Sequence, residues 1–366
     1  MKKILFILHF PPPVHGSSIV GQSIKESKII NETFDCRYIN LLVSRTMFET
    51  GKLSITKIIR FFSVWFELLQ NLTWNKPDIC YLALSTSSKA FYKDAFLVFW
   101  LRIFGVKVVY HLHNKGVSIY EGQFIDRQLY RFVFKNSKVI LLSDKLYKDI
   151  KTFVKTSDVY ICHNGIEDLA IDPKIETNDS IDPAKILFLS NLIETKGVTV
   201  LLEACRILKQ KGLNFTCDFI GAEGDLSAAQ FEEKVNQLGI EDRVRYLGKR
   251  YGKDKLEAFS NADIFAFPTY YNNECFPLVL LEAMSANLPI VSTFEGGIPD
   301  IVSDNVTGFL VPKNDALALA EKLELLITHP ELCIEMGKEG RKKFKSEFTL
   351  SIFETRMKAI LEQLGQ

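Results

Sequence analysis

Short runs of apolar residues, each followed by a polar loop and a helix-forming segment, recur along the chain. Such runs predict buried strands, and their alternation with helices is typical of parallel α/β sheets. The strands expected in the first half are residues 3–8, 35–45, 78–82, 106–113, 139–143 and 159–163. Those expected in the second half are residues 185–190, 215–221, 244–248, 264–268, 289–293 and 308–312.

Helical periodicity predicts the intervening helices. The expected helices are residues 19–30, 55–72, a segment capped by Ser85–Ser88 and running to 104, 198–211, 276–286 and an amphipathic 351–364. The helix over 55–72 carries many large apolar residues beside Lys57 and Arg60. This pattern favours packing in the core, and it leaves adsorption to a membrane surface open.

Two carboxylates stand out in the segment from 262 to 312. Glu274 precedes the helix expected over 276–286, and Glu282 lies within that otherwise apolar helix. An acid on such a helix lies either at its solvent edge or in a cleft. The first N–H groups of a helix lack intrahelical partners and can receive a phosphate or sugar oxygen, although Pro277 has no N–H to give. The segment therefore predicts a site for an anionic ligand that also carries hydroxyl groups.

Composition narrows the class of protein. The 366 residues, enough for about two domains, include 45 basic and 44 acidic residues, so the net charge gives no indication of nucleic-acid binding. The seven cysteines are scattered, which favours reduced thiols in a cytosolic compartment. Neither a signal peptide nor an apolar run long enough to span a bilayer is expected.

The motifs of the second half resemble those of a known enzyme family. Glu274-Cys-Phe-Pro-Leu-Val-Leu-Leu-Glu282 is similar to the E-x7-E signature of retaining, nucleotide-sugar-dependent glycosyltransferases of family 4, which have the GT-B fold. Further matching segments follow the family's order: 187–197 with Lys196-Gly197, 219–223, 244–248, 262–263, 295–299 and 307–311. The turn His163-Asn164-Gly165-Ile166 resembles the family's interdomain turn.

The resemblance implies an α/β protein with two Rossmann-like domains whose parallel sheets face each other across a cleft. The expected boundaries are an N-terminal acceptor-binding domain over 1–166, a polar linker over 167–184 and a nucleotide-sugar-binding domain over 185–348. The terminal helix, about 349–366, is expected to cross back to the first domain, which would then be discontinuous.

The resemblance also implies roles for individual residues. It assigns catalysis to His113, Lys196 and Glu274, where Lys196 meets the diphosphate, Glu274 holds the sugar hydroxyls and His113 contacts the sugar. It assigns donor binding to Gly16, Asn191, Lys196, Gly221, Tyr246, Glu274, Phe276, Leu278 and Glu282, with Glu282 on the ribose. The chain departs from the family pattern at Asn191, which replaces an arginine, and at Gly16, which stands where paired glycines are usual.

The implied activity is transfer of a hexose-type sugar, with a UDP-sugar favoured as donor, to a glycan or lipid-linked hydroxyl in surface polysaccharide assembly. No cofactor or metal is expected, because family precedent and the absence of an acid cluster both point away from a divalent ion. The expected location is cytoplasmic, and association with the inner face of a membrane is left open. The alternatives are a degenerate nucleotide-sugar-binding homologue, a GT-B epimerase or phosphorylase, and a two-domain solute-binding protein.

Overall fold

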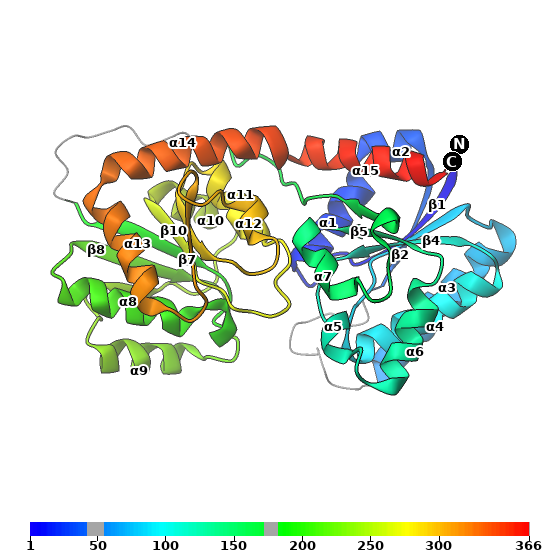
Figure 1. The fold of residues 1–366 in the computed structure, drawn as a ribbon, viewed down its shortest axis with the longest axis horizontal. Coiled ribbons are helices and arrows are strands. Elements are labelled where there is room, and N and C mark those ends of the chain that lie inside the picture. The colour runs from blue at the N-terminus through cyan, green and yellow to red at the C-terminus, as the bar shows by residue number, and fades with distance from the viewer. Residues whose placement is uncertain (42–54, 172–181, 366) are drawn as a thin grey trace. The chain divides into compact units, whose positions relative to one another are not determined.

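The computed structural model describes residues 1–41, 55–171 and 182–365, which form two compact units (Figure 1). The first unit comprises Met1–Gly165 together with Leu350–Gln366, and the second comprises Ile166–Thr349. Most of the stretch expected to be a linker, and the end of the strand expected over 35–45, lie outside the described residues.

The first unit is built on a six-stranded parallel sheet with the order β2-β1-β3-β4-β5-β6. Its strands correspond to the runs expected from the sequence, although the fifth begins one residue earlier, at Lys138. The central strands are buried on both faces and therefore read as continuous apolar stretches. The strands of this sheet are β1 (Lys3–Leu8), β2 (Asp35–Asn40), β3 (Ile79–Leu82), β4 (Lys107–Leu112), β5 (Lys138–Leu141) and β6 (Val159–Ile161).

One helix of the first unit differs from the prediction. The segment expected as a single helix over 19–30 is two helices, α1 (Gly16–Glu26) and α2 (Lys28–Thr33). Ser27 between them has an extended backbone, and its hydroxyl accepts a hydrogen bond from Ile30 N, 3.3 Å away. A serine in this conformation caps a new helix rather than continuing the old one.

Helices cover the faces of the first sheet (Figure 1). Neighbouring helices α3, α4 and α6 form one layer, and the terminal helix α15 packs against α2. Ser87 is the N-cap of α4, but its side chain makes no capping hydrogen bond, contrary to the expected serine cap. The remaining helices are α3 (Ile55–Trp74), α4 (Ser88–Ile103), α5 (Val117–Tyr120), α6 (Phe124–Phe134), α7 (Tyr147–Ile150) and α15 (Leu350–Gly365).

The second unit has a sheet of the same size and kind, with the order β12-β11-β10-β7-β8-β9. In both units the strand order reverses beside a central strand, and ligands of open α/β sheets bind at the carboxyl ends of strands next to such a reversal. The strands are β7 (Ala184–Leu189), β8 (Phe215–Ile220), β9 (Val244–Tyr246), β10 (Ile264–Phe267), β11 (Ile290–Thr293) and β12 (Gly308–Val311).

Helix α11 begins at Leu278, two positions later than the sequence predicted, because Pro277 takes the N-cap position with an extended backbone. A short 3-10 turn, η4 (Glu194–Lys196), follows β7. The other helices of this unit are α8 (Val198–Gln210), α9 (Ala228–Leu238), α10 (Gly252–Asn261), α12 (Ile298–Ile301), α13 (Ala316–Thr328) and α14 (Pro330–Glu347).

Candidate functional site

The loops that follow β7 and β10 meet at the carboxyl edge of the second sheet. Gly197, directly after η4, has a φ of +92°, which favours glycine. A Cβ on Gly197 would also lie 2.3 Å from the carbonyl oxygen of Pro268. Tyr270 N donates a hydrogen bond to the carbonyl of Thr195, at 2.8 Å. These backbone contacts bring Lys196 next to the polar loop after β10.

Lys196 and Glu274 form an ion pair in this position. Lys196 Nζ lies 2.5 Å from Glu274 Oε2, and the two side chains are only 17% and 9% exposed. Thr269 Oγ1 lies 3.4 Å from the same carboxylate oxygen, and the Lys196 ammonium lies 4.6 Å from the centre of the Tyr271 ring. Partial burial strengthens this attraction and makes either charge costly to leave unpaired.

The backbone on both sides of Glu274 is held by the loop after β11. Gly296 has a φ of +55°, and a Cβ there would lie 2.3 Å from the carbonyl oxygen of Glu274. Gly297 N donates to the carbonyl of Cys275, at 2.7 Å. The two glycines that the sequence places in this loop therefore allow it to pack directly on the Glu274 backbone.

Helix α11 starts beside the ion pair. Leu278 is its first residue, where helix geometry leaves an N–H group without an intrahelical acceptor. Phe276 is buried, and its ring contacts that of Phe348 at 5.8 Å between centroids. Phe276 thus anchors the helix start through its side chain, so only its backbone can serve the expected role in donor binding.

Glu282, the second acid of the signature, has a cation partner of its own. Its Oε1 lies 2.6 Å from Nζ of Lys255 on α10. Lys255 is therefore engaged by Glu282 in the structure. This ion pair fixes the orientation of the carboxylate that the resemblance assigns to the ribose.

The remaining donor-binding candidates of this unit hold one another in place. Asn191 Oδ1 accepts from Ala222 N at 3.2 Å, and the Tyr246 hydroxyl donates to the carbonyl of Gly221 at 2.9 Å. A Cβ on Gly221 would lie 1.9 Å from the carbonyl oxygen of Ser190, so the loops after β7 and β8 require glycine there. These observations give Asn191, Gly221 and Tyr246 structural roles at the same sheet edge.

Histidines gather at the carboxyl edge of the first sheet. The rings of His111 and His113 lie 4.2 Å apart, and those of His9 and His15 lie 5.8 Å apart. Burial, with a smaller contribution from His15, lowers the pKa of His113 to about 4. Burial also lowers the pKa of His9, His15 and His111, so the four imidazoles are neutral near pH 7. His111 is fully buried and hydrogen-bonded to the Tyr81 hydroxyl, so it has a structural role in the core of the first unit.

The structure gives His15 a local role. Its Nδ1 accepts from Ser18 N at 3.3 Å, while its backbone N donates to Ser18 Oγ at 3.0 Å, which forms a capping box at the start of α1. A Cβ on Gly16, the next residue, would meet no atom within 4 Å, so sterics do not demand glycine there. Position 21 does require glycine, because a Cβ on Gly21 would lie 2.1 Å from the carbonyl oxygen of His9.

The structure therefore brings Lys196, Glu274 and the start of α11 together within the second unit, and Asn191, Gly221 and Tyr246 along the same edge. Sequence reasoning gave no roles to Thr269, Tyr271 and Gly21. The polar run after β10 was the available signal for the first two, and nothing local marks Gly21. Within the described residues, no group of three His, Cys, Asp or Glu side chains is arranged to hold a metal ion.

Several solved structures share this architecture, including WaaG, a glycosyltransferase involved in lipopolysaccharide biosynthesis. The chain resembles sucrose-phosphate synthase from Thermosynechococcus elongatus, with a TM-score of 0.77 at 18% identity over 100% of this chain and 99% of that one. It also resembles Anabaena HepE, crystallised with UDP-glucose, with a TM-score of 0.71 at 16% identity over 99% and 100% of the two chains. The protein thus has the GT-B fold.

Sequence comparison agrees with the fold. Residues 170–343, just under half of the chain, match the family described as Glycosyl transferases group 1, and they lie within the second unit. The amylovoran biosynthesis glycosyltransferase AmsK of Erwinia amylovora is 32% identical over 269 residues, or 69% of this chain and 65% of the relative. A capsular polysaccharide biosynthesis glycosyltransferase of Staphylococcus aureus is 28% identical over 165 residues, or 45% and 42%. The chain spans less than two thirds of the length of either relative.

Proposed function

We propose that the protein is a glycosyltransferase that moves a hexose from a nucleoside diphosphate donor to a hydroxyl group, with retention of the anomeric configuration. In this reaction the bond between the sugar C1 and the β-phosphate oxygen breaks, and a bond from C1 to the acceptor oxygen forms. The acceptor proton passes to the departing phosphate. The observation that carries the proposal is the buried pair of Lys196 and Glu274 beside the start of α11.

This arrangement suits departure of a nucleoside diphosphate. Negative charge builds on the phosphate as the bond to C1 breaks. The N–H of Leu278 and the Lys196 ammonium, once it turns from Glu274 to the phosphate, would stabilise this charge. Glu274 is an acceptor for sugar hydroxyls, and Glu282, already oriented by Lys255, is an acceptor for ribose hydroxyls. His113 would meet the sugar as a neutral imidazole. Because Lys196 and the helix start supply the positive charge, we propose that no metal ion is required.

The donor and setting are proposed from similarity. HepE, which shares the fold, was crystallised with UDP-glucose, so a UDP-sugar is the favoured donor. The relatives that act in amylovoran and capsular polysaccharide biosynthesis favour a glycan or lipid-linked acceptor. The alternative is a nucleotide-sugar-binding homologue without activity. It is favoured by Asn191, a neutral side chain where the family usually has a second cation on the diphosphate.

Calorimetric titration with UDP, GDP and ADP in the presence of EDTA tests the donor site. One nucleotide is expected to bind, and Lys196→Ala is expected to weaken its binding by roughly 10- to 100-fold, because a charged hydrogen bond to the diphosphate is lost. Lys211→Ala is the matched control, since Lys211 forms an exposed ion pair with Glu324 in the same unit. Equal affinities of the wild-type protein and Lys196→Ala would contradict the assignment.

The first unit carries an apolar patch that is compatible with a lipid-linked acceptor. We define the patch as the Ile and Phe side chains of α3, α4 and α6 that are between 39% and 77% exposed. They are Ile55, Ile58, Ile59, Phe62, Phe66, Phe96, Phe99, Ile103, Phe124 and Ile125. The three helices lie side by side (Figure 1). Among the described residues, no helix is both long and apolar enough to cross a bilayer.

Charge around the patch favours an anionic membrane. Arg127 and Arg131 on α6 are exposed, while the acids Asp94 and Asp126 on α4 and α6 are buried. Burial raises the pKa of Glu67, the acid of α3. Exposed aromatic and aliphatic side chains beside cations are typical of surfaces that adsorb to anionic lipid. We therefore propose that the first unit binds the cytoplasmic face of a membrane through this patch.

Cosedimentation with phosphatidylglycerol vesicles tests the patch. The double variant Phe62→Ser/Phe66→Ser is expected to bind the vesicles at least about tenfold more weakly, because two exposed rings can no longer enter the lipid. Phe294→Ser, at an exposed phenylalanine of the second unit, is expected to bind as the wild type does. Failure of the wild-type protein to bind the vesicles would refute the role of the patch without affecting the proposed activity.

A further inference from the structure

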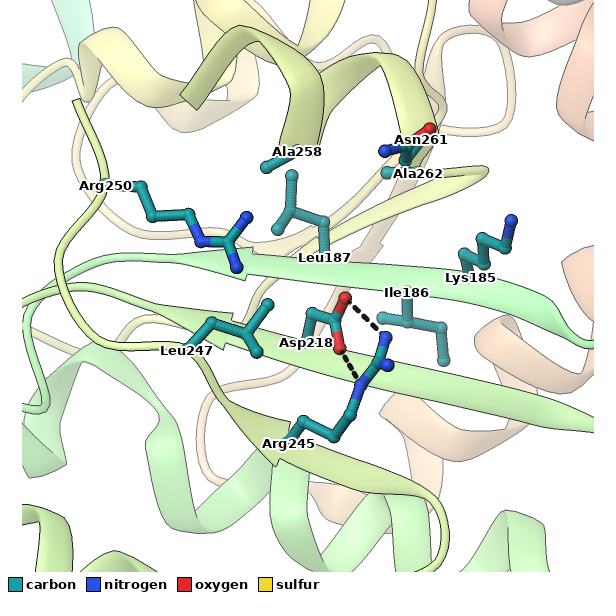
Figure 2. A pocket seen from close by; sticks show the side chains of 10 residues that line it. All are labelled: Lys185, Ile186, Leu187, Asp218, Arg245, Leu247, Arg250, Ala258, Asn261 and Ala262. Carbon is teal, nitrogen blue, oxygen red and sulfur yellow. Dashed lines mark hydrogen bonds and ion pairs between the residues drawn. The ribbon is translucent and has the colours of Figure 1, made fainter. Parts of the chain in front are cut away.

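A pocket opens on a face of the sheet in the second unit (Figure 2). Its volume is about 240 Å³. Leu187, Asp218 and Arg245 are register partners on β7, β8 and β9, so their side chains lie in one row across the sheet. Ala258 and Asn261 of α10 form the opposite wall (Figure 2). The pocket extends along the strands from Lys185 and is separate from the pair of Lys196 and Glu274, neither of which lines it.

The lining combines an apolar floor with cations. Leu187 and Ala262 are buried, whereas the side chains of Lys185, Arg245 and Arg250 bring positive charge to the walls. Asp218 neutralises one of these cations, because its two oxygens accept hydrogen bonds of 2.8 and 3.0 Å from Arg245. This fork-to-fork contact fixes the Arg245 guanidinium in the wall.

The other two cations lack such a neutralising partner. Among the described residues, neither Lys185 Nζ nor the Arg250 guanidinium has a hydrogen-bond or ion-pair partner, although the backbone N of Lys185 bonds to Asp263. Lys185 is near the start of β7 and Arg250 follows the end of β9, so the two lie at opposite ends of the pocket (Figure 2). Each end of the pocket therefore presents one cation without an ion-pair partner, with apolar surface between them, and the Asp263 carboxylate beside Lys185 offsets part of the charge at that end.

We propose that this pocket binds a small organic anion that carries an acidic group at each end, such as a sugar bisphosphate. One acidic group would pair with Lys185 and the other with Arg250, while the carbon skeleton would cover Leu187 and Leu247. A ligand with a single acidic group would leave one cation without an anion. The proposal does not depend on the transferase activity, because it concerns other residues.

Calorimetric titration of the full chain with glucose 1,6-bisphosphate, glucose 6-phosphate and glucose tests the proposal. The bisphosphate is expected to bind at least about tenfold more tightly than the monophosphate, and glucose is expected not to bind. Lys185→Gln and Arg250→Gln are each expected to reduce the affinity for the bisphosphate to that for the monophosphate. Lys253→Gln removes a charge from the exposed first turn of α10 outside the pocket, and it should bind as the wild type does.

Binding at the donor site would give a different pattern. Lys196→Ala is expected to bind glucose 1,6-bisphosphate with wild-type affinity, and saturating UDP is expected not to displace it. Loss of binding in Lys196→Ala, displacement by UDP, or equal affinity for the two phosphates would overturn the proposal. No detectable binding of the bisphosphate to a wild-type protein that is folded by circular dichroism would also overturn it.

Discussion

At the scale of single residues, the Glu274 carboxylate and the diphosphate of the donor compete for the Lys196 ammonium. The ammonium lies 2.5 Å from the carboxylate, yet the proposed reaction needs it on the diphosphate. Binding a diphosphate must therefore weaken the ion pair, and sugar hydroxyls must then satisfy the carboxylate that is left. The pair can thus couple recognition of the phosphate to recognition of the sugar.

This coupling predicts different effects of Glu274→Gln on the affinities for two ligands. UDP, which lacks the hexose, is expected to bind the variant more tightly than the wild type, because Lys196 no longer has a competing carboxylate. UDP-glucose is expected to gain less or to lose affinity, because a charged acceptor for its hydroxyls is gone. Titration of both ligands measures the difference. Parallel changes in the two affinities would show that Glu274 acts on the nucleotide alone.

The lowered pKa of His113 in the first unit predicts how stability and the protonation of this residue depend on pH. The pKa of His113 is lowered on folding to about 4 from its usual 6.5, so the unfolded chain binds the proton more readily. This contribution to stability is complete above about pH 6.5 and is lost as the pH falls toward 4. Histidine NMR titration is expected to show the His113 imidazole neutral down to about pH 5. An inflection for His113 at or above pH 6.5 would contradict its burial.

Sequence reasoning at the residue scale identified the acids but not their partners. Glu274 and Glu282 were recognisable because charged residues are unusual in so apolar a segment. Their pairing with Lys196 and Lys255 depends on contacts between separate loops and helices, which the spacing of residues does not encode. For the same reason, Asn191 could be recognised as a missing cation, but its bond to the loop after β8 could not be foreseen.

At the scale of elements, the close approach of the loops after β7 and β8 depends on glycine at position 221. Gly221→Ala would place a Cβ 1.9 Å from the carbonyl oxygen of Ser190, so the loops after β7 and β8 must separate. The variant is expected to lower the free energy of unfolding by about 1–3 kcal/mol, measured by denaturant titration. Gly122→Ala, where a Cβ meets nothing within 4 Å, is the control and should change stability little. Equal stability of the two variants would contradict the packing argument.

Strands were easier to predict than helix ends. Each expected strand that lies within the described residues corresponds to an observed one, because two-sided burial produces an apolar run that is visible locally. Helix boundaries depend on single caps. Ser27 divides the helix expected over 19–30, and Pro277 delays the start of α11, since each residue adopts an extended backbone at that point. The sequence favoured core packing for α3, and this was wrong for one face: Val64, Leu68 and Leu72 are buried, whereas many of its large apolar side chains are exposed. Apolar content alone could not distinguish an exposed face from a buried one.

At the scale of the whole molecule, each of the two units has a six-stranded parallel sheet, and candidate site residues lie at the carboxyl edge of each sheet. The first unit contains the neutral histidines and the apolar patch. The second unit contains the two ion pairs between glutamate and lysine and the start of α11. The two sheets could be predicted from the alternation of strands and helices, whereas the GT-B assignment required the motif order. The pocket that contains Lys185 and Arg250 was not predicted, because no local pattern marks it.

The most direct test of the account is turnover of a sugar donor by the purified protein in EDTA. We would measure nucleoside diphosphate release from a panel of UDP-, GDP- and ADP-sugars, with water as the acceptor. The account predicts slow release from one member of the panel, a rate at least about 100-fold lower for Lys196→Ala, and an unchanged rate for Lys211→Ala. No release from any donor, or wild-type turnover by Lys196→Ala, would contradict the proposed glycosyltransferase mechanism.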